Sequence, residues 1–179
     1  MNIRRIVAAL AATAALVPVS GSAIGEAERT VPGSSCTVGK ENLVFNGEVG
    51  QWEGRASVTC PLRADGSPSL QAQIDMNFVV THVQGVGTFP EPGLTGPATF
   101  TSKDPTTGVT TYSCIACPSL QSFGTYLALS PGLYMMKASA VITQNTQAGT
   151  VYRRGNHATC FLVRGEASDM VTPVPGCTL

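Results

Sequence analysis

Apolar and polar residues alternate through much of the chain after residue 36. The clearest segment is 70–82, where side chains at every second position share one face. Its apolar face carries Leu70, Ala72, Ile74, Met76, Phe78 and Val80, and its polar face carries Gln71, Gln73, Asp75, Asn77 and Thr81. A period of two over this length indicates a long strand in an antiparallel sheet with one solvated face.

The same period recurs in several shorter segments. We expect a strand over Val109–Cys114 and inward faces made by Leu43 and Phe45, by Ala56, Val58, Cys60 and Leu62, by Tyr134, Met136, Ala138, Ala140 and Ile142, and by Ala158, Cys160 and Leu162. No segment after residue 23 has a helical period of adequate length. Roughly seven strands at this spacing predict an all-β fold, an antiparallel β-sandwich that is immunoglobulin-like or related and is stapled by disulfides.

The start of the strand at Tyr134 has a distinctive turn. A Leu is followed by Ser130-Pro131-Gly132, and the Tyr then begins the long strand. This arrangement resembles the tyrosine corner of immunoglobulin-like sandwiches, in which the Tyr hydroxyl bonds back to upstream backbone. The resemblance covers about ten residues and supports a sandwich, not a particular family.

Three segments lack a regular period. Gln84–Gly108 is rich in Pro and Gly, which predicts a long irregular loop with a short strand at Ala98–Thr101. We expect Gln144–Asn156 to form a hairpin connection and Met170–Leu179 to form a tail.

The N-terminus has the organisation of a secretory signal peptide. Arg4 and Arg5 precede the apolar run Ile6–Val19, and small residues end at Ala23. The run is shorter than the roughly 20 residues that span a bilayer, and no later segment is apolar enough to do so. We therefore predict a signal peptide over 1–23, a flexible leader over 24–35, and a single domain over 36–179. The mature protein is expected to be secreted, with no membrane span.

Six cysteines follow the predicted cleavage point, and an even number in an exported chain predicts disulfides. They allow 15 connectivities. The favoured pairs are Cys36 with Cys60, Cys114 with Cys117, and Cys160 with Cys177, and the chief alternative joins Cys60 to Cys160. Cys36 and Cys60 flank a predicted hairpin whose turn lies near Glu48–Gly50, so they would face each other.

The net charge limits the classes of binding partner that we expect. The chain has 11 basic and 11 acidic residues, and removal of Arg4 and Arg5 leaves two more acids than bases. A nucleic-acid or anionic-membrane partner would favour a basic surface, so neither is expected. An extracellular protein is the partner that we consider.

The motif Cys114-Ile115-Ala116-Cys117 has three interpretations. A structural bridge is favoured, because no basic residue lies near in sequence to stabilise a thiolate. A thiol–disulfide redox pair is the second interpretation. A zinc site is the third, although it needs four ligands and a second close pair is missing.

No catalytic, metal or cofactor site is predicted. His82 is expected on the inward face at the end of a strand, and His157 on the outward face at the start of another. No Gly-x-Ser-x-Gly elbow accompanies them. The acids that glycoside chemistry would require are expected to be solvated at outward or turn positions: Glu41, Glu48, Glu53 and Asp75.

Three residues are candidates for partner binding. Trp52, the single tryptophan, lies in a predicted turn, where it either anchors a partner or folds back over the sheet edge. Arg153 and Arg154 are expected at a hairpin tip, as a basic contact or a solvated turn. The sequence favours a secreted, non-enzymatic binding or structural module of unknown ligand. The alternatives are a protease or hydrolase inhibitor and a thiol–disulfide oxidoreductase using Cys114 and Cys117, so enzymatic activity stays open.

Overall fold

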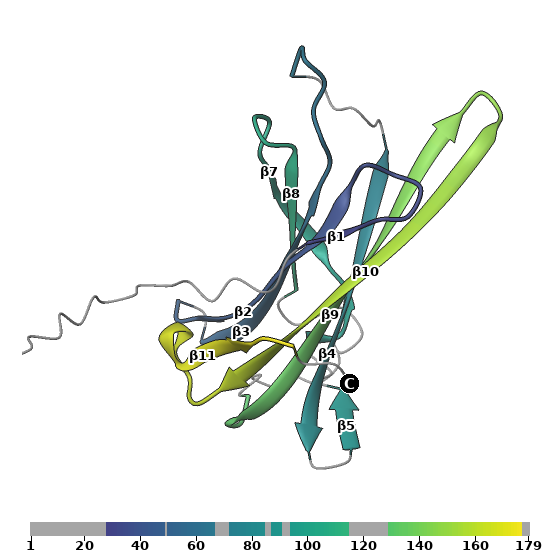
Figure 1. Cartoon of the computed structure of the whole chain (residues 1–179). Coiled ribbons are helices and arrows are strands. Elements are labelled where there is room, and N and C mark those ends of the chain that lie inside the picture. The colour runs from purple at the N-terminus through teal and green to yellow at the C-terminus, as the bar shows by residue number, and fades with distance from the viewer. Residues whose placement is uncertain are drawn as a thin grey trace, which may run out of the picture.

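The alternating segments form two antiparallel β-sheets in the computed structural model (Figure 1). The structure describes residues 28–48, 50–66, 72–84, 87–90, 94–114 and 129–176. In chain order the elements are β1 Arg29–Thr30, β2 Thr37–Asn46, β3 Gln51–Thr59, β4 Gln73–Gln84, β5 Gly87–Pro90, β6 Gly96–Pro97, β7 Thr99–Lys103, β8 Val109–Cys114, β9 Gly132–Thr146, β10 Gly149–Val163, the 3-10 turn η3 Ser168–Met170, and β11 Val171–Val174. These ranges contain no α-helix, so the all-β prediction is confirmed. The predicted signal peptide lies outside the described residues.

The strands divide between the sheets without mixing. The first sheet has the order β1-β2-β3-β8-β7, and the second has the order β11-β10-β9-β4-β5, with β6 also paired to β4. All of these pairs are antiparallel. Buried side chains from both sheets form one hydrophobic cluster. The sheets are in direct contact at Gly54, where an added Cβ would lie 3.2 Å from Met136 and 3.4 Å from Phe78.

Most predicted inward positions are confirmed. The core includes Leu43, Ala56, Val58, Met76, Phe78, Val80, Tyr134, Met136, Ala138, Ala140 and Ile142. Phe45 and Ile74 are partly buried against it. The period of two therefore identified the inner face of β4 and β9 correctly.

Tyr134 is held by the turn before β9 on one side and by a ring of β4 on the other. The Tyr134 hydroxyl donates to the backbone carbonyl of Ser130 over 2.8 Å. The His82 ring, on the inward face as predicted, stacks on the Tyr134 ring with centroids 4.4 Å apart. A Cβ at Gly132 would lie 2.3 Å from His82 Nε2, so the chain needs a glycine there.

β2 contains a β-bulge next to Glu41, whose side chain is buried. Gly39 pairs with Ser57 and Asn42 pairs with Arg55, so Lys40 and Glu41 together oppose a single residue of β3. Lys40 has a φ of 54° in the left-handed region. Glu41 lies two residues before Leu43 on the same inward face, so it is 0% exposed and the prediction of a solvated side chain was wrong.

Of the other three acids, one is buried and two are exposed. Glu53 is also buried, so the prediction of a solvated side chain was wrong, and its carboxylate accepts two hydrogen bonds of 2.7 Å from Arg55. Glu48 and Asp75 are exposed, as predicted.

The inward face of β10 is displaced by one residue from the prediction. Phe161 and Val163 belong to the core, whereas Ala158 is exposed and Leu162 is half-buried. Cys160 is buried but lies outside the core cluster. A shift of one residue exchanges the two faces of a strand. The predicted set was therefore the outer face.

Segments expected to be irregular contain paired strands. The predicted loop Gln84–Gly108 includes β5, β6 and β7, and β7 takes the place of the short strand expected at Ala98–Thr101. Gln144–Asn156 is mostly strand rather than connection, and β11 lies within the predicted tail. In the predicted leader, β1 pairs with β2 and Val31 is fully buried.

One predicted disulfide is described in full. Cys36 and Cys60 are bonded with a Cα–Cα distance of 4.2 Å, next to the paired residues Thr37 and Thr59. This bond excludes the alternative of Cys60 with Cys160. Cys114 and Cys160 are each disulfide-bonded. The partners predicted for them, Cys117 and Cys177, lie outside the described residues.

Candidate functional site

The seam between the sheets is where β10 passes β1 and β2 (Figure 1). Gly155 of β10 makes this approach possible, because an added Cβ would lie only 2.6 Å from Val31. Val31 follows β1 directly, so its burial fixes β1 against β10. The seam therefore brings residues from the N-terminal strands beside residues near the C-terminus.

A buried carboxylate joins the two sheets at this seam. Glu41 Oε2 lies 2.7 Å from His157 Nδ1 and accepts a hydrogen bond of 3.0 Å from the Thr159 hydroxyl. The His157 side chain is 12% exposed, so the prediction that it points outward was wrong. Glu41 Oε1 has no hydrogen-bond partner among the described residues. Burial without full pairing is costly, so these contacts must hold the carboxylate firmly.

A carboxylate bound to an imidazole supplies two of the three members of a nucleophile–base–acid triad. Here the hydroxyl that contacts the pair, Thr159, donates to the carboxylate rather than to the imidazole. Its oxygen is therefore not activated by His157 in this arrangement. The geometry fits a polar tie between sheets better than a catalytic centre.

A second carboxylate, Glu28, sits before β1 and holds the open end of the β2–β3 hairpin. The hydroxyls of Thr37 and Thr59 donate to its two oxygens, and Lys40 Nζ lies 3.1 Å away. Burial raises the pKa of Glu28, but these three partners more than offset it and hold that pKa below its usual value. Glu28 thus stabilises the fold in its charged form.

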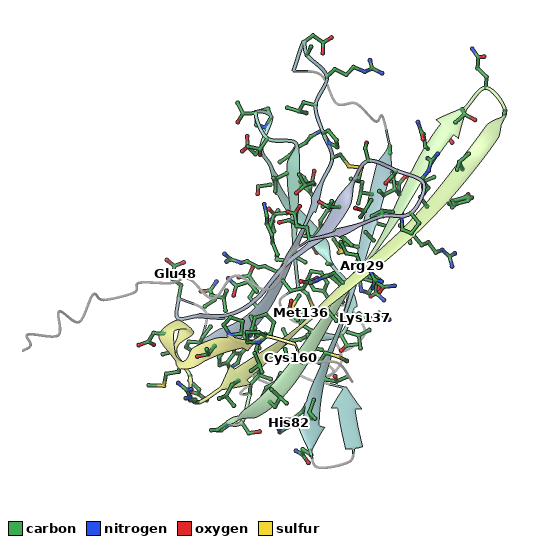
Figure 2. All side chains as sticks on the ribbon, in the orientation of Figure 1. Arg29, Glu48, His82, Met136, Lys137 and Cys160 are labelled. Carbon is green, nitrogen blue, oxygen red and sulfur yellow. A yellow bond between two sulfur atoms is a disulfide. The ribbon has the colours of Figure 1, made fainter. Side chains whose placement is uncertain are left out.

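An open groove lies along the seam. It has a volume of about 220 Å³ and is lined by Arg29, Thr30, Pro32, Arg154, Gly155 and Asn156. Figure 2 shows Arg29 near the place where β1 passes β10. Arg29 was missed by the sequence analysis because it lies within the predicted leader, which carries no periodicity.

The three predicted binding residues lie in different environments in the structure. Trp52 is fully buried beside Phe45, with ring centroids 5.5 Å apart, so it offers no surface to a partner. Arg153 and Arg154 lie within β10, not at the hairpin tip as predicted. Arg153 donates to Gln144 Oε1 over 2.7 Å, whereas Arg154 lines the groove.

The end of the β9–β10 hairpin is the most exposed apolar surface near these arginines. The two strands project from the rest of the molecule (Figure 1). Among the described residues, β4 pairs with β9 as far as Thr143, and residues 144–146 and 149–151 pair with each other alone. Tyr152 is 64% exposed and Val151 is 37% exposed.

Two other kinds of chemistry, thiol exchange and metal binding, depend on an accessible cysteine and on clustered ligands. Cys114 is disulfide-bonded and 2% exposed, which makes its sulfur a poor target for thiol exchange. Within the described ranges, no three His, Cys, Asp or Glu side chains gather where they could hold a metal ion. A search of these ranges also finds no helix long and apolar enough to cross a membrane.

Comparison with known proteins finds no family model, no curated protein and no solved structure that the chain matches.

Proposed function

We propose that the chain is a secreted, non-enzymatic binding module that contacts an extracellular protein through the end of its β9–β10 hairpin. The observation that carries this proposal is the 64% exposure of Tyr152, directly beside the two-stranded end of the hairpin. Tyrosine combines a large apolar surface with a polar end and is enriched at protein interfaces.

The projection is ordered by its own cross-strand contacts. The Thr146 hydroxyl donates to the Gly149 carbonyl over 2.8 Å, and the Thr150 hydroxyl donates to Asn145 Oδ1 over 3.0 Å. Side chains that are already held in place lose less entropy when a partner binds. A rigid hairpin with an exposed aromatic residue therefore suits recognition.

Export and the finer fold class belong to the same proposal. The Cys36–Cys60 disulfide supports export through a signal peptide over 1–23, because disulfides persist in oxidising compartments. The contact of Gly54 with Met136 and Phe78 supports a sandwich of the two sheets. The bond from Tyr134 to Ser130 supports the immunoglobulin-like class.

Photo-crosslinking tests the proposed contact. A photoreactive phenylalanine replaces Tyr152 in one variant and Glu48 in a control, since Glu48 lies in the exposed turn of the β2–β3 hairpin (Figure 2). Each protein is applied to the outer surface and medium of the cells that produce it. We expect a discrete adduct from position 152 that unlabelled wild-type protein displaces and Y152A does not. Equal labelling from both positions, or displacement by Y152A, would overturn the proposal.

A further inference from the structure

We propose that the groove between β1 and β10 binds a tetrahedral oxyanion, sulfate or phosphate, between Arg29 and Arg154. This inference does not depend on the hairpin contact proposed above. It rests on three observations: the charge left unpaired at the groove, the rigidity of its walls, and the kind of donors that line it.

The charges around the seam are unequally paired. The two carboxylates that the structure describes beside the seam have partners: Glu28 is held by Thr37, Thr59 and Lys40, and Glu41 by His157 and Thr159. In contrast, the guanidinium groups of Arg29 and Arg154 have no ion-pair or hydrogen-bond partner in the part of the chain that the structure describes. Two positive groups on one groove make the local electrostatic potential more positive, which favours the binding of an anion.

The walls of the groove are fixed by packing. Val31, between the lining residues Thr30 and Pro32, is fully buried against Gly155. β1 pairs with β2 on its other side. The two arginines are thus carried by backbone segments that cannot separate without exposing Val31. The volume of about 220 Å³ is far above the roughly 10–15 Å³ that one water needs.

The lining groups determine the class of ligand. Guanidinium groups donate only, in a planar fork that matches the oxygens of phosphate, sulfate or carboxylate. Thr30 and Asn156 add a hydroxyl and an amide to the lining. Two guanidinium groups match a doubly charged tetrahedral anion better than a singly charged planar carboxylate.

The test is a titration followed by NMR on the full mature protein. Sodium sulfate, sodium phosphate and sodium acetate are added separately at pH about 8 and constant ionic strength maintained with chloride. The reporters are the backbone amides of Gly155 and Asn156. Four proteins are compared: wild type, R29Q, R154Q and R63Q. Arg63 is an exposed arginine in the loop after β3, so R63Q removes the same charge away from the groove.

We expect saturable shifts at Gly155 and Asn156 in wild type and R63Q with sulfate and phosphate. R29Q and R154Q should each raise the apparent Kd by about tenfold or more, as expected for the loss of hydrogen bonds from a charged donor. Acetate should bind more weakly than either dianion. Shifts that do not saturate, or that weaken equally in R63Q, would overturn the site. Acetate binding as tight as sulfate would overturn its tetrahedral class.

Discussion

The two long hairpins of this protein are stabilised in opposite ways. The β2–β3 hairpin is irregular: it contains a bulge, a left-handed Lys40 and a disulfide at its open end. The β9–β10 hairpin is regular, with 15-residue strands paired without interruption. One hairpin is held by particular local contacts, and the other by continuous pairing.

The difference shows in how burial is distributed. Both faces of the β2–β3 hairpin have a bound carboxylate near the bulge: Glu41 is fully buried on the inner face, and Glu28 is partly exposed on the outer face. Along β9–β10, burial instead falls from the centre to the tip: Ala140 and Ile142 are in the core, and Val151 and Tyr152 are exposed. Stability is therefore concentrated at the seam, and the tip is left free to make contacts.

Replacement of Glu41 should have the largest effect on stability. Glu41→Ala leaves His157 and Thr159 without their buried acceptor and removes the tie between the sheets. We expect a loss of about 3–5 kcal/mol in the free energy of unfolding, measured by urea denaturation. Glu48→Ala makes the same chemical change at an exposed turn and should cost less than about 0.5 kcal/mol. Equal effects of the two variants would show that Glu41 does not tie the sheets.

Loss of the Cys36–Cys60 bond should have the next largest effect. The bond closes a segment with a sequence separation of 24. In the chain-entropy model, its removal in the double variant C36A/C60A costs about 3–4 kcal/mol. Hydrogen exchange should accelerate more in β2 and β3 than at the tip of β9–β10. Uniform acceleration would mean that the hairpins unfold as one unit and that the contrast between them is not energetic.

In the regular hairpin, the sequence predicts the inner face of one strand correctly and that of the other strand incorrectly. Alternation identified the inner face of β9, yet it placed β10 one residue out of register. The apolar residues Ala158, Cys160 and Leu162 alternate along β10, although Phe161 and Val163 are the residues in the core. Two apolar sets one residue apart cannot be separated by period alone, because both faces of β10 are partly covered.

For the candidate site, the sequence carries a usable signal for Glu41 but none for the bulge or the groove. Leu43 and Phe45 were assigned inward, and continuing their alternation back by two residues reaches Glu41. The bulge was not predictable, because Lys40 is not a residue that commonly adopts positive φ. The groove could not have been inferred either, since Arg29 and Arg154 are brought together only by the packing of Val31 on Gly155.

Acid should weaken the open end of the β2–β3 hairpin through Glu28. Because the pKa of Glu28 is depressed in the folded state, its contribution is present above the unfolded value of 4.5 and is lost as the pH falls through the folded value. At pH about 7, Glu28→Gln should cost less than about 1 kcal/mol, since the group is partly exposed. The difference from wild type should shrink towards pH about 3 in urea denaturation. A difference that stays constant with pH would show that packing, not charge, is responsible.

Removal of the exposed tyrosine should have the smallest effect on stability and the largest on binding. Tyr152 lies outside the core, opposite Thr143, which is the last residue of β9 that pairs with β4 among the described residues. Tyr152→Ala should therefore change the free energy of unfolding by less than about 0.5 kcal/mol. Phe161→Ala, a truncation in the core of the same strand, should cost about 3–5 kcal/mol. If Tyr152→Ala instead destabilised the protein by more than about 1 kcal/mol, the tip would belong to the folded core, and its exposed ring would no longer distinguish the two hairpins.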